Sequence, residues 1–77
     1  MSTVETAAKL VSMANQIGRF FEPQRQGEPA LAIADHLRKF WDPRMRAAIV
    51  AHLDAGGDGL DGPVREAVRR LKETSRS

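Results

Sequence analysis

The sequence predicts an all-α protein, a small single domain of about four short helices, and three observations support this prediction. Apolar residues recur at intervals of three and four positions through most of the chain, which is the spacing of one helix face. No run alternates apolar and polar residues over the length of a strand. Proline, glycine and aspartate punctuate the breaks between the periodic segments. We therefore expect one helical domain over residues 1–77, with a frayed tail from about Thr74.

The first expected helix runs from about Thr3 to Phe21. Ser2 is a suitable N-cap and Glu5 follows three residues later, the spacing of a capping box. The apolar stripe of this helix consists of Ala7, Leu10, Ala14, Ile17 and Phe21. Phe20 widens the stripe, whereas Met13 lies outside its centre.

The second expected helix follows a connector over residues 22–27, which contains both proline and glycine. It opens at Glu28, with Pro29 in the first helical position, where the missing N–H costs nothing. Its stripe consists of Ala30, Ile33, Ala34, Leu37 and Trp41. Asp42 and Pro43 end this helix and start the next, because the residue before proline avoids the helical conformation and aspartate is a favoured N-cap.

The third expected helix runs from Pro43 to about Ala55, and Gly56 or Gly57 can supply its left-handed C-terminal cap. Its stripe consists of Met45, Ala48, Ile49, His52 and Leu53. A loop with four glycines follows over residues 56–62. The fourth helix begins at Pro63. Its stripe consists of Val64, Ala67, Val68 and Leu71, beside a cationic ridge of Arg65, Arg69, Lys72 and Arg76.

The composition excludes several classes of protein. Of the 77 residues, 42% are apolar and 29% charged, which is ordinary for a soluble globular domain. The absence of cysteine removes disulfides, thiol catalysis, iron–sulfur ligation and thiolate zinc sites, and it favours a reducing compartment. No apolar run approaches the ~20 residues of a membrane span, and the polar N-terminus does not resemble a signal peptide.

Two motifs in the glycine-rich loop fail the tests of their chemistry. Residues 57–62 match G-x-G-x-x-G, but they follow a helix where a dinucleotide fingerprint follows a strand, so a helix–helix turn is favoured. A calcium loop starting at Asp54 would place Arg65 where a bidentate glutamate is needed. His36 and His52 have no second ligand at metal-binding spacing and no nucleophile beside them. We therefore expect no catalytic and no metal-binding residues.

The segment from residue 35 to residue 46 is the candidate partner-binding surface. It places large apolar side chains between four cations, and such residue types are enriched at interface cores. The candidate contact residues are His36, Arg38, Phe40, Trp41, Asp42, Arg44, Met45 and Arg46. Phe40 and Trp41 would be the anchors, and the arginines would pair with carboxylates or cofactor phosphates. A core tryptophan with solvated flanking charges is the alternative, and a net charge of +2 makes nucleic-acid binding the weakest reading.

Three stretches of the chain carry a family resemblance: MANQIGRFFE, IADHLRKFWDPRMRAAIVAHLDAGGDGL and VREAVRRL. They resemble the delta subunit of soluble, NAD-dependent, molybdenum-containing formate dehydrogenases, over roughly Leu10 to Leu71. The string DHLRKFWDPRMR is the most specific part. One departure is Gly62 before Pro63, where a serine-like helix cap would be expected.

The resemblance implies a non-catalytic accessory subunit of a cytoplasmic complex that oxidises formate to carbon dioxide and reduces NAD. The complex carries bis-molybdopterin guanine dinucleotide, iron–sulfur clusters and FMN in its other subunits, and the delta subunit has no cofactor of its own. The implied partner is the catalytic alpha subunit, with the beta and gamma subunits as further candidates. The implied role is assembly, cofactor maturation or stability.

An alternative function stays open beside this one: a small protein that binds a nucleotide or a pterin phosphate and regulates or matures the same enzyme. Exposed apolar stripes on an isolated subunit would also favour a homodimer.

Overall fold

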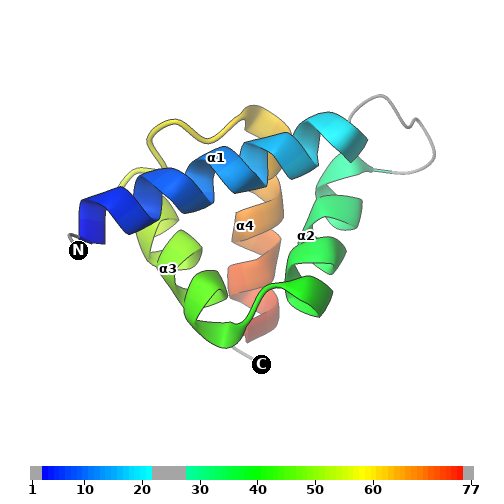
Figure 1. Cartoon of the computed structure of the whole chain (residues 1–77). Coiled ribbons are helices and arrows are strands. Elements are labelled where there is room, and N and C mark those ends of the chain that lie inside the picture. The colour runs from blue at the N-terminus through cyan, green and yellow to red at the C-terminus, as the bar shows by residue number, and fades with distance from the viewer. Residues whose placement is uncertain (1–2, 22–27, 76–77) are drawn as a thin grey trace.

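The computed structural model describes residues 3–21 and 28–75, and over these residues the chain forms four α-helices and no strand (Figure 1). Helix α1 spans Thr3–Phe21, α2 spans Pro29–Phe40, α3 spans Pro43–Asp54 and α4 spans Gly62–Ser75. The predicted all-α fold is confirmed. The expected connector over residues 22–27 and the expected N-cap Ser2 lie outside the described residues.

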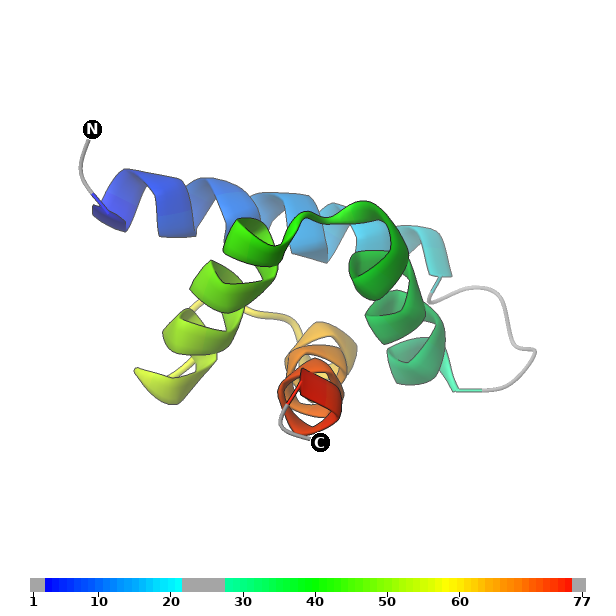
Figure 2. The same ribbon diagram turned by 90° about the horizontal axis from the view of Figure 1, so that it is seen from below.

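Helix α4 lies between α2 and α3, and α1 crosses the other three helices on one side (Figures 1 and 2). Helices α2 and α3 each contact both α1 and α4, and the α2–α4 contact is the most extensive. By contrast, α2 and α3 meet mainly at the short corner that joins them. This corner therefore lies at the edge of the bundle, while the C-terminal half of α1 buries Ala14 and Gly18 and exposes Phe20.

The helix starts follow the proline and aspartate signals of the sequence. Pro29 and Pro43 each occupy the first turn of a helix. The Asp42 carboxylate accepts a hydrogen bond from the Met45 backbone N–H at 3.0 Å, so the expected N-cap of α3 is confirmed. Glu28 makes no such side-chain bond at the start of α2.

Helix α3 ends in a Schellman motif built on two glycines. The N–H of Gly57 donates to the carbonyl of His52 at 2.9 Å, and the N–H of Gly56 donates to that of Leu53 at 3.0 Å. Both glycines have positive φ, 125° for Gly56 and 67° for Gly57, which a side chain would disfavour. The expected glycine cap is confirmed.

Helix α4 differs from expectation at both ends. It begins at Gly62 rather than Pro63, because the Arg65 N–H closes the first turn onto the Asp61 carbonyl. It also includes Thr74 and Ser75, where a frayed tail was expected. Residues 76–77 lie outside the described residues.

One hydrophobic core joins all four helices and the loop before α4. Its most completely buried large side chains are Ile33, Leu37, Ile49, Val64 and Val68. The other buried apolar residues are Leu10, Val11, Ala14, Ala30, Trp41, Leu60, Ala67 and Leu71. No polar or charged residue among the described ones is buried. The core holds no chemically reactive group, so any function must reside on the surface.

Candidate functional site

Trp41 belongs to the core and not to the surface. It is only 5% exposed, and its backbone N–H donates to the Leu37 carbonyl at 3.0 Å, which closes the last turn of α2. Met45, in the first turn of α3, is half-buried and packs against the same core. The alternative of a core tryptophan is therefore the one the structure supports, and Trp41 offers little surface to a partner.

Phe40 takes the opposite position, although it is adjacent to Trp41 in the sequence. Its side chain is 71% exposed, the highest value among the large apolar residues of the described chain. On one side it contacts the His36 ring, with centroids 4.7 Å apart. Because successive helical residues differ in direction by about 100°, Trp41 points inward while Phe40 projects outward at the corner.

The aromatic contacts continue from α2 onto α1. The His36 ring contacts Phe21 edge to face at 5.8 Å, and Phe21 contacts Phe20 at 5.2 Å. Phe20 is 67% exposed. Together Phe20, Phe21, His36 and Phe40 form what we call the aromatic row, which crosses from the end of α1 to the end of α2.

An open groove of about 330 Å³ lies beside the aromatic row. Residues from α1 and His36 of α2 line it: Met13, Gln16, Ile17, Phe20, Phe21 and His36. The sequence-based candidate surface missed its α1 half. The available signal was two consecutive phenylalanines at the edge of the α1 stripe, where the second of two bulky neighbours is less easily covered by the same core.

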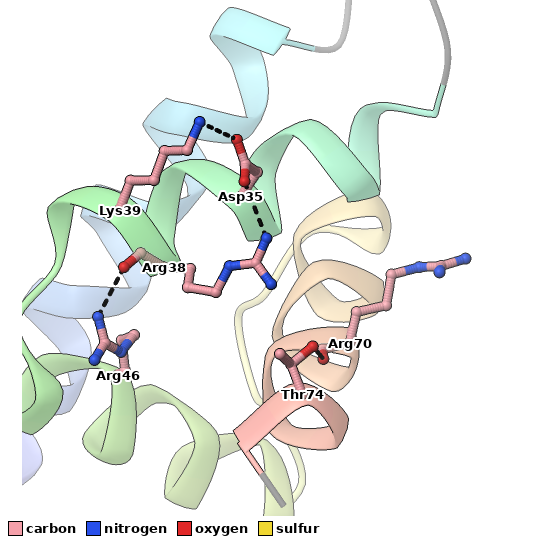
Figure 3. A network of polar contacts seen from close by, with 6 residues as sticks. All are labelled: Asp35, Arg38, Lys39, Arg46, Arg70 and Thr74. Carbon is pink, nitrogen blue, oxygen red and sulfur yellow. Dashed lines mark hydrogen bonds and ion pairs between the residues drawn. The ribbon is translucent and has the colours of Figure 1, made fainter. Parts of the chain in front are cut away.

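Arg38 and Lys39 hold the carboxylate of Asp35 from two sides. Each places a nitrogen 3.0 Å from an Asp35 oxygen (Figure 3). The hydrogen bond from Lys39, and then that from Arg38, lower the pKa of the Asp35 carboxyl below its usual value. Asp35 therefore neutralises one of these two cations, and the cluster keeps a net charge of +1.

Arg46 and Asp42 serve the backbone of the corner. The Arg46 guanidinium donates to the Arg38 carbonyl at 2.9 Å (Figure 3). It also donates to the Trp41 carbonyl at 2.6 Å. It thereby satisfies carbonyls at the C-terminal end of α2, which lack helical partners. Asp42 caps α3. These two candidate contact residues fix the geometry of the corner, and Arg44 projects from it as an exposed cation.

The carboxylates of α2 and of its two ends already have partners. Glu28 pairs with Arg70 of α4 at 3.2 Å, Asp35 pairs within α2, and Asp42 caps α3. Three cations on the same helices differ, because their side chains form no ion pair or hydrogen bond with another described residue. They are Lys9, Arg19 and Arg44. Among the described residues, Arg19 and Arg44 are therefore exposed cations without a carboxylate partner, and each is close in sequence to an exposed aromatic ring.

The glycine-rich loop is a structural turn held by three side chains. The Asn15 amide donates to the Gly59 carbonyl at 2.9 Å and accepts from the Asp61 N–H at 3.0 Å. His52 Nε2 donates to the Asp58 carbonyl at 2.7 Å. Arg65 donates to the carbonyls of Gly56 and Gly57, each at 3.0 Å. The predicted helix–helix turn is confirmed, and the loop carbonyls that these side chains engage are occupied within the chain.

The described residues show no arrangement typical of a metal site. They contain no cluster of three or more histidine, cysteine, aspartate or glutamate side chains that could hold an ion. A groove between α2 and α4 contains Arg38 and Arg70, which could face a phosphate, but both guanidinium groups already pair with carboxylates. No observation on these residues favours small-ligand binding over partner binding.

The fold and this surface define a class: a small all-α protein whose exposed apolar side chains gather mainly on one side. Of the four exposed large apolar residues in the described chain, Met13, Phe20 and Phe40 lie along the groove and the aromatic row. A family model described as the NADH-dependent formate dehydrogenase delta subunit matches residues 9–68. The chain belongs to this family. No curated protein and no solved structure shows significant similarity to it. Among the described residues, no helix has the length and apolar character needed to traverse a bilayer.

Proposed function

We propose that the chain is a non-catalytic accessory subunit that binds the catalytic alpha subunit of a cytoplasmic NADH-dependent formate dehydrogenase. Its role is to support assembly, cofactor maturation or stability of that subunit. The bis-molybdopterin guanine dinucleotide, the iron–sulfur clusters and FMN belong to the other subunits. The family match supports membership of such a complex, and the absence of cysteine agrees with a chain that ligates no cluster.

The observation that carries the docking proposal is the exposure of Phe40 at the α2–α3 corner. In the free chain the Phe40 side chain is 71% exposed, so most of its apolar surface remains in contact with water. Burying such a side chain contributes about 1.5–3 kcal/mol. Asp42 and Arg46 fix the adjoining corner through hydrogen bonds to its backbone. A rigid, protruding aromatic side chain beside exposed arginines has the character of an interface hot spot.

Replacing Phe40 with alanine tests this surface. The tagged chain would be co-expressed with the alpha subunit, and its affinity measured by biolayer interferometry. We expect Phe40→Ala to weaken binding by at least about 30-fold, as for a hot-spot residue, with an unchanged melting temperature. Leu31→Ala is the matched control, because Leu31 is 50% exposed on the same helix but lines the groove toward α4.

Three outcomes would contradict parts of the proposal. If Phe40→Ala binds with wild-type affinity, the α2–α3 corner is not part of the interface. Wild-type chain that co-purifies with the beta or gamma subunit alone would change the partner. Wild-type chain recovered alone, or only as a homodimer, would reject the accessory-subunit function.

The metal content of the alpha subunit distinguishes cofactor maturation from stabilisation as the role of the docked chain. The alpha subunit would be purified from cells with and without this chain, and its molybdenum measured by mass spectrometry. A lower molybdenum content without the chain indicates cofactor maturation. Equal content with faster loss of formate-dependent NAD reduction indicates stabilisation of the finished enzyme.

A further inference from the structure

We propose that the groove between α1 and α2 receives one large apolar side chain from the partner, and that carboxylates flank this side chain in the partner sequence. This inference rests on the proposed function, because it names the chemistry of the segment that the accessory subunit would bind. It adds the C-terminal half of α1 to the α2–α3 corner as part of the contact surface.

The groove has the shape and lining of a receptor for a side chain. Met13, Ile17 and Phe20 line it from α1, and the His36 ring closes it from α2. His36 is itself held between Phe21 and Phe40, with centroids 5.8 and 4.7 Å away. An inserted ring would therefore meet aromatic surfaces on more than one side, and such aromatic contacts contribute about 0.5–1.5 kcal/mol each beyond burial.

The volume of the groove limits the occupant. It measures about 330 Å³, at the lower end of the ~300–1,000 Å³ typical of small-molecule sites. It is also open along one side. Such a space accommodates one or two side chains rather than a dinucleotide cofactor, so a protein segment is the occupant that fits.

Exposed cations close in sequence to the aromatic row favour an acidic segment. Arg19 precedes the exposed ring of Phe20, and Arg44 follows the exposed ring of Phe40 four residues later. Neither guanidinium pairs with a carboxylate among the described residues. Glu28, just before α2, and Asp35, within α2, already pair with cations of this chain. A partner segment with carboxylates beside its apolar anchor would pair with Arg19 and Arg44, whereas a basic segment would be repelled.

A photo-crosslinker placed at two positions tests the inference. Benzoylphenylalanine would replace Phe20 in one variant and Leu31, on the α4 side of α2, in the control. Each variant would be irradiated in the co-expressed complex, and the crosslinked peptide identified by mass spectrometry. We expect a strong crosslink from position 20, at least fivefold above that from position 31, to an alpha-subunit peptide with several aspartates or glutamates near the crosslinked residue.

The outcomes separate this inference from the proposed function. If the wild-type chain co-purifies with the alpha subunit but position 20 gives no crosslink, the groove is not part of the interface, and the accessory function stands. A neutral or basic crosslinked peptide would overturn the prediction that the bound segment is acidic. A crosslink between two copies of this chain would show that the groove binds a second copy and not the alpha subunit. If the wild-type chain does not co-purify, the proposed function itself fails.

Charge reversal provides a second readout. Each of the single variants Arg19→Glu and Arg44→Glu should bind the alpha subunit at least fivefold more weakly at 50 mM salt, with most of the change in the association rate. Arg69→Glu is the control, because Arg69 is an exposed cation of α4, away from the groove. Equal loss in the control would show that only net charge matters, and would overturn the assignment to this groove.

Discussion

At the residue scale, Gly18 sets how closely α1 approaches α4. It lies on the buried face of α1. A Cβ atom built at this position would lie 2.5 Å from Cγ2 of Val64 and 3.6 Å from Cδ1 of Ile33. Val64 is almost completely buried and cannot move aside freely. The absence of a side chain at position 18 is therefore a requirement of the helix crossing.

We expect Gly18→Ala to destabilise the protein by about 1–2 kcal/mol. The overpacking lowers the free energy of unfolding by about 1–3 kcal/mol. The higher helix propensity of alanine offsets this loss by up to ~1 kcal/mol. Urea denaturation followed by circular dichroism measures the difference. Gly62→Ala is the control, because a Cβ at Gly62 meets no atom within 4 Å. If Gly18→Ala proves as stable as Gly62→Ala, the crossing does not depend on Gly18.

Sequence reasoning at this scale found the capping residues but not the contacts across the fold. Asp42 could be predicted as an N-cap because the cap, the proline and the helix are adjacent in the chain. Gly18 looks like any glycine within a helical stripe. Its role depends on Val64, which is distant in the sequence and close only after the helices pack.

At the scale of elements, the loop between α3 and α4 is fixed by Asn15 of α1. The Asn15 amide uses both its donor and its acceptor on the loop backbone, at Gly59 and Asp61. Leu60, between them, is buried in the core. The asparagine thus anchors the glycine-rich loop while Leu60 fills the space beneath it.

We expect Asn15→Ala to cost about 1–2 kcal/mol, since two hydrogen bonds of about 1 kcal/mol each are lost. Amide hydrogen exchange measured by NMR should show a marked loss of protection at Asp61, whose N–H donates to Asn15. Gln16→Ala should change the stability by less than ~0.5 kcal/mol, because Gln16 is exposed on the next position of α1. Unchanged exchange at Asp61 in Asn15→Ala would show that the loop holds its own conformation.

The elements themselves were largely predictable, because each begins or ends with a local signal. Proline marks the starts of α2 and α3, and a pair of glycines marks the end of α3. The side chains that hold the glycine-rich loop were not predictable. In particular, Arg65 belonged to the expected cationic ridge, whereas it bonds to loop carbonyls eight and nine residues earlier.

At the scale of the whole molecule, two adjacent aromatic residues divide between the interior and the surface. The apolar stripe placed Trp41 with the core-facing residues, while its position at a helix break beside cations suggested an anchor. The direction of each side chain at the end of α2 decides between these interpretations, because Trp41 lies one turn after Leu37 on the buried face and Phe40, the last helical residue, faces outward. Whether that face is covered depends on helices that are distant in the sequence, so sequence patterns alone could not settle the site.

The single tryptophan makes this division measurable. We expect the fluorescence emission of Trp41 to be blue-shifted and poorly quenched by acrylamide in the folded chain, because the ring is 5% exposed. Binding of the alpha subunit should leave the emission maximum nearly unchanged, while unfolding in urea should shift it to the red. A strong shift on binding, in a chain that stays folded, would return Trp41 to the contact surface.

The position of α4 in the chain also bears on when the protein can fold during synthesis. Val64, Val68 and Leu71 of α4 supply the inner surface against which α2 packs. Until the ribosome has made these residues, Ile33 and Leu37 have no such surface to cover them. Folding must then await the last helix, and docking onto a partner follows translation of α4 rather than accompanying it. A ribosome-bound chain arrested before residue 62 should accordingly be degraded rapidly by added protease.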